Sequence, residues 1–204
     1  MSEEGDFESI FLRENIICKE CQTQFKKHKK IYLIDGIEWH VLYEYNEFIE
    51  RLFFQYKEQK DIALSKVFLF DIKNKLKKVE KKYNLCGMCS SSKKYLERGF
   101  DALFTIFKSH NIFLYQPLYK KKDVKQSEQT KEDRRLIKNI IERKQAYPLR
   151  KEKICLIDDV CTTGASMKKG CELLKPDIVF IIAAHPLWIE SHKENIVEKK
   201  GVFW

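Results

Sequence analysis

The residues best suited to chemistry in this 204-residue chain lie together in one stretch, KICLIDDVCTTGASM, from Lys153 to Met167. Two adjacent carboxylates, Asp158 and Asp159, follow an apolar run, and a segment of hydroxyls with one glycine comes directly after them. Carboxylates suit ribose hydroxyls or Mg²⁺ but repel phosphate, whereas free backbone N–H groups at the start of a helix attract phosphate. The stretch therefore predicts a ribose 5-phosphate site.

The phosphate is expected to bind in the loop that follows the carboxylates. Gly164 would let the backbone approach the ligand closely, and the next helix would add the positive end of its dipole. A plainer alternative is a strand-to-helix turn in which one aspartate caps the helix and the glycine only turns the chain. We favour ligand binding because a cap needs one such residue and not the whole series. The predicted phosphate-binding residues are Thr162, Thr163, Gly164, Ala165 and Ser166.

A parallel α/β sheet would position these residues. The apolar run at 154–157 predicts a strand buried on both faces, and DIVFIIAA at 177–184 predicts another. The helical pattern between them makes a strand, helix and strand unit, which implies a parallel sheet with right-handed crossovers. Ligands in such sheets bind at the carboxyl ends of the strands, where the two aspartates are expected.

Other segments are assigned from their periodicity. The lysine-rich segment at 120–135 has no apolar period and is expected to be either a mobile lid beside the site or a disordered loop. The remaining expectations are helices at 45–57, 61–78 and 132–145, a strand at 111–119 interrupted at Pro117, and a final helix after the last strand.

Two CxxC pairs predict a structural zinc site. The pairs are Cys18 with Cys21 and Cys86 with Cys89. The turn between such cysteines directs both sulfurs toward one centre, as tetrahedral zinc requires. A redox dithiol is the rival interpretation, but two pairs in one chain favour zinc. The metal would then fasten the N-terminal part to the body of the protein.

The N-terminal part is expected to be a small zinc ribbon. Asp35-Gly36 lies between two strand-like runs and predicts a two-residue hairpin turn. We therefore expect a zinc-binding ribbon and hairpin at 1–45, with the zinc completed by 86–89, and a main domain at 46–204. His28 and His40 rank below the cysteines as ligands, because a histidine in an alternating strand is usually packed or exposed.

Composition limits the class of protein. A hydrophobic content of 44% is enough for a core, and a net charge of +9 favours a polyanionic partner. No apolar run is long enough to cross a bilayer, and the acidic N-terminus does not read as a secretory signal. We therefore expect a cytoplasmic protein without a membrane span, whose 7 cysteines are thiols or metal ligands.

IDDVCTTGAS resembles the phosphoribosyl pyrophosphate (PRPP) motif of type I phosphoribosyltransferases. Further stretches, in order from about residue 18 to 180, resemble the ComF (ComFC) family of bacterial competence proteins, in which a zinc ribbon is fused to a phosphoribosyltransferase domain. The chain departs from that family in the position of its second CxxC pair and in Asp101, which replaces an asparagine. The matching stretches are YEYNEFIERLFFQYK with Asp61 and Ala63-Leu64, SKKYLERGFD, Gln126-Ser127 with Arg134, and LIDDVCTTGAS.

The resemblance implies a type I phosphoribosyltransferase-like parallel sheet flanked by helices, with a small N-terminal zinc-ribbon element. It implies that Asp158 and Asp159, the catalytic pair, bind the ribose hydroxyls, and that 162–166 hold the 5-phosphate. Mg²⁺ would bridge ribose and pyrophosphate oxygens. Cations after a predicted strand end suit the pyrophosphate, and these are Lys93, Lys94 and Arg98.

The expected function is that of a PRPP-binding competence protein that handles single-stranded DNA in the cytoplasm during DNA uptake and natural transformation. Basic runs with aromatic neighbours, at 25–32 and 115–122, predict weak, salt-sensitive and sequence-tolerant binding to single-stranded DNA. Other competence proteins are further expected partners. The alternative is an active Mg²⁺-dependent phosphoribosyltransferase acting on an unidentified base or amine. A combined role, with the site as a sensor, also stays open.

Overall fold

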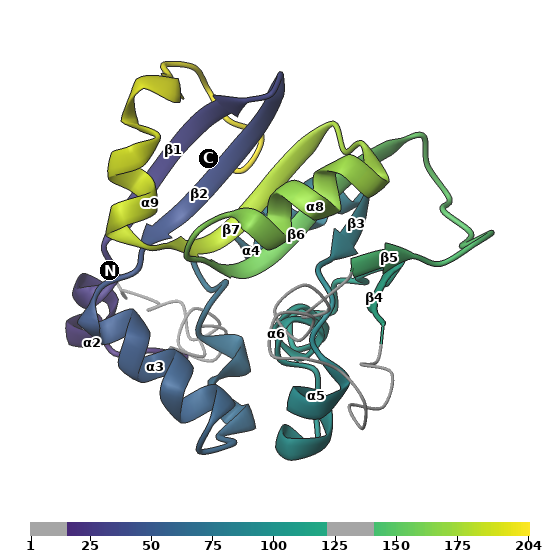
Figure 1. Ribbon diagram of the computed structural model, residues 1–204. Coiled ribbons are helices and arrows are strands. Elements are labelled where there is room, and N and C mark those ends of the chain that lie inside the picture. Colours follow the sequence, from purple (N-terminus) through teal and green to yellow (C-terminus); the bar gives the residue numbers. More distant parts are fainter. Residues whose placement is uncertain (1–15, 122–140) are drawn as a thin grey trace, which may run out of the picture.

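A six-stranded sheet organises the computed structural model, which describes residues 16–121 and 141–204 (Figure 1). The strand order is β3-β6-β7-β2-β1-β8, and the first four of these strands are parallel. β1 is antiparallel to both of its neighbours. The strands are β1 (Lys27–Ile34), β2 (Ile37–Glu44), β3 (Tyr83–Gly87), β6 (Lys153–Cys161), β7 (Ile178–Ala184) and β8 (Ile196–Val197).

Helices cover both faces of this sheet, and a separate two-stranded ribbon lies beside it (Figure 1). The ribbon consists of β4 (Leu118–Lys120) and β5 (Ile141–Arg143). The α-helices are α2 (Lys19–Gln24), α3 (Glu47–Lys57), α4 (Lys73–Glu80), α5 (Ser92–Arg98), α6 (Ala102–Lys108), α8 (Ala165–Leu174) and α9 (Pro186–Ser191), and the 3-10 helices are η1 (Ile62–Lys66) and η2 (Lys193–Asn195).

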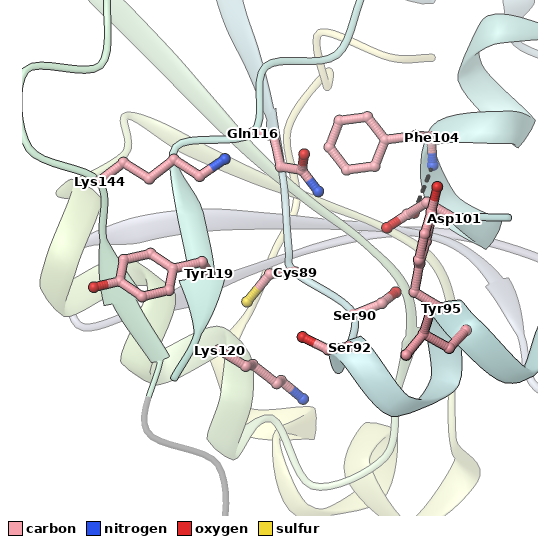
Figure 2. Close-up of a pocket in the computed structure, with 11 residues that line it drawn as sticks. Cys89, Ser90, Ser92, Tyr95, Asp101, Phe104, Gln116, Tyr119, Lys120 and Lys144 are labelled. Atoms are coloured by element: carbon pink, nitrogen blue, oxygen red, sulfur yellow. Dashed lines mark hydrogen bonds between the residues drawn. The ribbon is translucent and has the colours of Figure 1, made fainter. Parts of the chain in front are cut away.

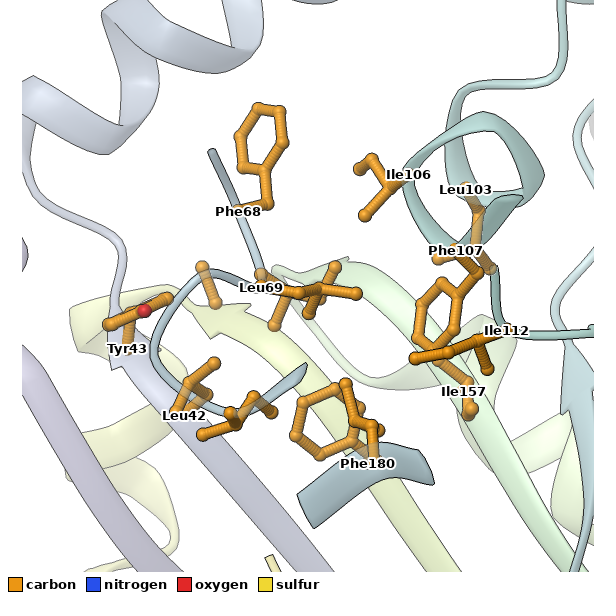
Figure 3. Packing of buried hydrophobic residues seen from close by; sticks show 14 of the residues in the cluster. Leu42, Tyr43, Phe68, Leu69, Leu103, Ile106, Phe107, Ile112, Ile157 and Phe180 are labelled. Carbon is orange, nitrogen blue, oxygen red and sulfur yellow. The ribbon is translucent and has the colours of Figure 1, made fainter. Parts of the chain in front are cut away.

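Alternation of side chains along the strands produces two cores. On β6, Cys155 and Ile157 point to the face covered by α3, α4 and α6, which we call the first core. Leu156 points to the second core, which α8, α9 and the ribbon cover. Figure 3 shows Ile157 and Phe180 of the sheet among the helix and loop residues of the first core. Both cores are built on the same strands, so both faces of the central sheet are buried.

The central prediction of a parallel sheet is confirmed. β6, α8 and β7 form the expected strand, helix and strand unit, and residues 155–161 of β6 pair in parallel with 178–184 of β7. The hairpin turn is also confirmed, because Asp35 and Gly36 both have positive φ values, 49° and 78°. Asn46 caps α3, its Oδ1 accepting from the Ile49 N–H at 2.9 Å, so the helix expected at 45–57 begins at Glu47.

Other predicted elements are corrected. The helix expected at 61–78 is divided into η1 and α4, because Phe68 and Leu69 between them turn into the first core. The strand expected at 111–119 is reduced to β4 and a single bridge at Tyr115. Residues 141–143, expected at the end of a helix, form β5 because they pair with β4. The final helix ends at Ser191 and is followed by η2 and β8.

The N-terminal hairpin belongs to the main sheet, which corrects the expectation that it forms a separate zinc ribbon. β2 pairs in parallel with β7 along its length, from Glu38 with Ile178 to Glu44 with Ala184. The physical reason is that β2 is apolar on both faces, with Val41 in the second core and Leu42 in the first. The expected boundary at residue 45 therefore falls within a continuous structure. Among the described helices, none combines the length and apolar character needed to span a bilayer.

Candidate functional site

The two predicted catalytic carboxylates lie near the carboxyl end of β6. Asp158 and Asp159 are still within the strand, and Asp158 pairs with Ile181 of β7. The Asp158 Oδ1 atom accepts a hydrogen bond from the Asp159 N–H at 2.9 Å. Both residues are half-buried. The sheet therefore holds two adjacent carboxylates at the edge where parallel α/β sheets bind ligands.

Lys57 is a member of this site that sequence reasoning did not select. Its Nζ atom lies 2.8 Å from Asp159 Oδ2, and the two side chains are only 16% and 15% exposed. The same Nζ lies 4.5 Å from the centroid of the Phe53 ring, which adds a cation–π contact. Lys57 is the last residue of α3 and of the stretch YEYNEFIERLFFQYK. That stretch carries part of the family resemblance, which is the signal that could have identified it.

Burial and charge together raise the pKa of two carboxyl groups near this edge of the sheet. Burial, reinforced by the neighbouring charge of Asp159, raises the pKa of Asp158 to about 7, although Lys57 and Lys120 act in the opposite direction. Burial also raises the pKa of Asp101, and the charge of Asp159 adds to this rise. A bound cation would release the proton from Asp158. The oxygens of the pair are the type that Mg²⁺ takes as ligands, so the residues present fit that ion.

The predicted phosphate loop lies directly beside the aspartate pair. Thr162, Thr163, Ala165 and Ser166 are exposed, and α8 begins at Ala165. The Thr163 Oγ1 accepts a hydrogen bond from the Ala165 N–H at 3.4 Å. The N-terminus of this 10-residue helix is consequently directed to the same edge as the carboxylates, an arrangement that suits an anion. The two threonines also line a shallow cavity of about 400 Å³ next to Trp188.

Both the backbone conformation at position 164 and the neighbouring Trp188 favour glycine there. Its φ is 77°, and a Cβ atom at this position would lie 2.9 Å from Trp188 Nε1. Gly164→Ala is expected to lower the free energy of unfolding by about 2 kcal/mol, because left-handed strain and a clash with a packed indole add together. The measurement is urea unfolding at neutral pH.

The matched control for this prediction is Gly99→Ala. Gly99 has a similar φ of 81°, but nothing lies within 4 Å of an added Cβ. This variant should lose only about 1 kcal/mol, the cost of the strained backbone. Equal losses in the two variants would show that Trp188 does not constrain the loop.

The cations predicted to face pyrophosphate lie on α5, and two of them pair with glutamates. Lys93 is 84% exposed and 3.8 Å from Glu97. Arg98 is bound to Glu58 at 2.7 Å, which ties α5 to the loop after α3. Lys94 is also exposed. None of these three cations lines the cavity that lies next to the aspartate pair.

That cavity, which we call the main cavity, has a volume of about 610 Å³ and lies between α5, α6 and the β4–β5 ribbon (Figure 2). It contains two lysines, Lys120 and Lys144. Burial raises the pKa of Cys89, and the positive charge of Lys120 opposes this rise, as it does at Asp158. Lys120 therefore links the main cavity electrostatically to the aspartate pair. Sequence reasoning noted the basic run around Lys120 but did not place it at a cavity.

The four predicted zinc ligands are not brought together. Cys21 packs against the first core, whereas Cys86 and Cys89 belong to the second. The reason is the period of β3, which directs Leu85 to one face of the sheet and Cys86 to the other. Cys18 caps α2 instead, its Sγ accepting the Cys21 N–H at 3.4 Å.

No group of three or more histidine, cysteine or acidic side chains suited to a metal ion occurs within residues 16–121 and 141–204. Burial raises the pKa of Cys86 to about 12. The alternative ligands are also occupied or enclosed. His28 is 2.6 Å from the Tyr32 hydroxyl, and His40 is fully buried against Phe203 and Trp204. The described residues show no group of ligands for one zinc ion, and the zinc site of two CxxC pairs stays a prediction.

Part of the predicted site lies outside the described residues. Gln126, Ser127 and Arg134, which carry one segment of the family resemblance, fall between 122 and 140. Most of the expected lid at 120–135 falls in the same interval, as does the start of the helix expected at 132–145. These expectations stay predictions.

The fold and this edge define a mixed α/β protein with a mostly parallel sheet and an acidic site beside a phosphate-type loop. No protein-family model matches the chain. A curated protein, Competence protein ComFC of Streptococcus pneumoniae (strain ATCC BAA-255 / R6), is 29% identical over 161 residues. The match covers 78% of this chain and 68% of that protein. This similarity supports the ComF resemblance that the motifs carry.

Proposed function

We propose that this chain is a competence-related protein of the cytoplasm that binds PRPP with Mg²⁺ and handles single-stranded DNA during natural transformation. One observation carries the PRPP part. The aspartate pair on β6 and the hydroxyl-rich loop before α8 adjoin at a single edge of the sheet. Similarity to a protein named Competence protein ComFC supports the competence part.

Each part of PRPP has a counterpart in this arrangement. The carboxylates of Asp158 and Asp159 would accept hydrogen bonds from the ribose hydroxyls and hold Mg²⁺. The loop at 162–166 would hold the 5-phosphate with its N–H groups and hydroxyls. Lys57 holds Asp159 in place through the 2.8 Å ion pair. Lys120 would face the pyrophosphate side, since its charge already acts on Asp158.

Phosphoribosyl transfer is a second candidate, favoured by the two adjacent carboxylates at the carboxyl end of β6. Such a transfer needs little acid–base chemistry from the protein, because pyrophosphate leaves readily once its charge is stabilised. Mg²⁺, when bound, would stabilise the charge of the departing pyrophosphate. Release of pyrophosphate during incubation with PRPP, Mg²⁺ and a panel of bases and amines would support this activity, and no release would remove it.

Calorimetric titration of PRPP with Mg²⁺ tests the main proposal. The double variant Asp158→Asn, Asp159→Asn should bind at least about tenfold more weakly than the wild type, because charge-assisted hydrogen bonds and Mg²⁺ ligands are both lost. Asp35→Asn is the matched control, since Asp35 is an exposed carboxylate in the hairpin turn and asparagine tolerates its positive φ. Absence of saturable binding by the folded wild type, or equal binding by the double variant, would contradict the proposal.

A further inference from the structure

The main cavity has the chemistry of a nucleotide site. We propose that it binds one nucleotide of a single-stranded nucleic acid, with the base between Tyr95 and Tyr119 and the backbone phosphate on Lys120 and Lys144. The inference rests on the proposed function, because it names the place where the single strand would touch the protein. It concerns a cavity next to the aspartate pair, and the two proposed sites share Lys120.

Two tyrosines on facing elements supply the stacking surfaces. Tyr95 of α5 is 50% exposed and Tyr119 of β4 is 38% exposed, although both line the cavity. Figure 2 shows Tyr119 and Lys120 on the ribbon side of the cavity and Tyr95 on the opposite side, with Cys89, Ser90 and Ser92 between them. Exposed aromatic rings at a cavity mouth can stack on any base, so they give binding without sequence preference.

The cations lie on the ribbon side. Lys120 belongs to β4, and Lys144 directly follows β5. Neither lysine forms an ion pair with another described residue, whereas the adjacent Lys121 is 3.4 Å from Glu142. The Lys144 Nζ atom lies 5.5 Å from the centroid of the Tyr147 ring, so among the described residues no carboxylate neutralises either ammonium group. Each phosphate that they neutralise releases counterions, which makes the binding salt-sensitive.

The carboxylate on the far side fixes the orientation of the nucleotide. Asp101 lies across the cavity from the two lysines (Figure 2), and its Oδ1 accepts the Phe104 N–H at 3.1 Å. A carboxylate repels phosphate but accepts hydrogen bonds from the N–H groups of a base. Gln116 lines the same cavity and can donate or accept. The phosphate is thus directed to the lysines and the edge of the base to Asp101 and Gln116.

The size of the cavity selects a single strand. A volume of about 610 Å³ falls within the range of sites for small ligands and accommodates one unstacked nucleotide. A base in a duplex is stacked and paired, so it could enter only after extrusion from the helix, at a cost in free energy. Single-stranded nucleic acid avoids this cost.

Fluorescence anisotropy with a short labelled oligothymidylate, at about 50 mM salt, tests the aromatic surfaces. The double variant Tyr95→Ala, Tyr119→Ala should bind at least about tenfold more weakly, because two stacking faces are removed. Tyr95→Phe, Tyr119→Phe should bind nearly as well as the wild type, since it keeps both rings and loses only hydroxyls. The control is Phe54→Ala, Phe113→Ala, which removes two aromatic rings that are exposed outside the cavity.

The lysines are tested by Lys120→Gln, Lys144→Gln. Affinity should fall, and the dependence of affinity on salt should become shallower. Lys75→Gln, Lys78→Gln on α4 makes the same change in net charge at exposed positions away from the cavity. This control should bind almost normally, so it separates a local site from a general effect of charge.

Alkylation of Cys89 gives a second readout that needs no variant. Cys89 lines the cavity and is 8% exposed, whereas Cys18 is exposed near the N-terminus. Peptide mapping should show that the oligonucleotide slows modification of Cys89 by iodoacetamide severalfold and leaves Cys18 unchanged. Equal rates at Cys89 with and without oligonucleotide would place the strand elsewhere and overturn the inference.

The remaining outcomes are also decisive. The inference is overturned if the tyrosine and lysine variants bind like their controls. Wild type that binds PRPP but no oligonucleotide would overturn it and leave the PRPP proposal standing. Conversely, cavity variants that lose the oligonucleotide, in a wild type that fails to bind PRPP, would support the inference and remove the PRPP proposal.

Discussion

Lys57→Met should lower the free energy of unfolding by about 2 to 3 kcal/mol, measured by urea denaturation at neutral pH. The substitution leaves Asp159 without its partner at a position where the side chain is only 15% exposed. An unpaired charge that is largely removed from water is costly, and the cation–π contact with Phe53 is lost as well. The expected loss lies below the range for fully buried pairs because some solvent still reaches both groups.

An exposed ion pair provides the control. Lys169 lies 3.0 Å from Glu172, but these side chains are 48% and 55% exposed. Lys169→Met should therefore change stability by less than about 0.5 kcal/mol. A second test is Lys57→Met, Asp159→Leu, which should be more stable than Lys57→Met alone because no charge is left unpaired. Equal stability of Lys57→Met and the wild type would mean that solvent screens the pair completely.

Acidification should destabilise the protein through two buried histidines. Burial lowers the pKa of His40 to about 4 and that of His110 to about 4. Both side chains are buried, and His40 is 0% exposed. Neither nitrogen of His40 has a hydrogen-bond partner among the described residues, and its Nε2 is 3.6 Å from Glu38 Oε2, too far for a good hydrogen bond.

The lowered pKa values of the two histidines make the folded state less stable as the pH falls. The folded state binds the proton less readily than the unfolded state, whose histidine pKa is about 6.5, so stability is lost as pH falls from 6.5 toward 4. For His40 the loss is roughly 2 kcal/mol between pH 7 and 5. Asp158 acts in the opposite direction, because its raised pKa lets the folded state take up a proton as pH falls through 7. Urea unfolding across this pH range measures the net effect of the histidines and Asp158 on the free energy of unfolding.

His40→Leu isolates the histidine. It should remove the roughly 2 kcal/mol that His40 contributes to the pH dependence and should leave the opposing effect of Asp158 in place. At pH 7 the variant should be at least as stable as the wild type, since leucine has no polar atoms to leave unsatisfied. A pH profile that matches the wild type would show that His40 gains a partner or water when it is protonated.

Local patterns predicted the parts of this fold that depend on neighbours in sequence. The β6, α8 and β7 unit follows from two apolar runs and the helical period between them, and the hairpin follows from Asp35-Gly36. The aspartate pair and its loop were predictable for the same reason. They are consecutive residues, so one strand end brings them together.

The features that the sequence patterns did not reveal are contacts between segments that are distant in the sequence. Lys57 reaches Asp159 only after α3 has packed onto the sheet, and no spacing in the sequence encodes that meeting. The spacing of the cysteines predicts a shared zinc ion, but spacing does not reveal that Cys21 packs against the first core whereas Cys86 belongs to the second. β5 was read as helix because its pairing with β4 depends on a partner more than twenty residues away.

The position of β2 has a consequence for the order of folding. β2 is an interior strand of the sheet, and its parallel partner β7 pairs Ile181 with Val41, residues from opposite ends of the chain. During synthesis, β2 lacks one of its two neighbouring strands until nearly the whole polypeptide has been made, because β7 lies close to the end of the chain. Pairing at such separation carries a large loop-closure entropy and slows folding. Until β7 emerges, the apolar faces of β2 are available to chaperones or to other nascent chains.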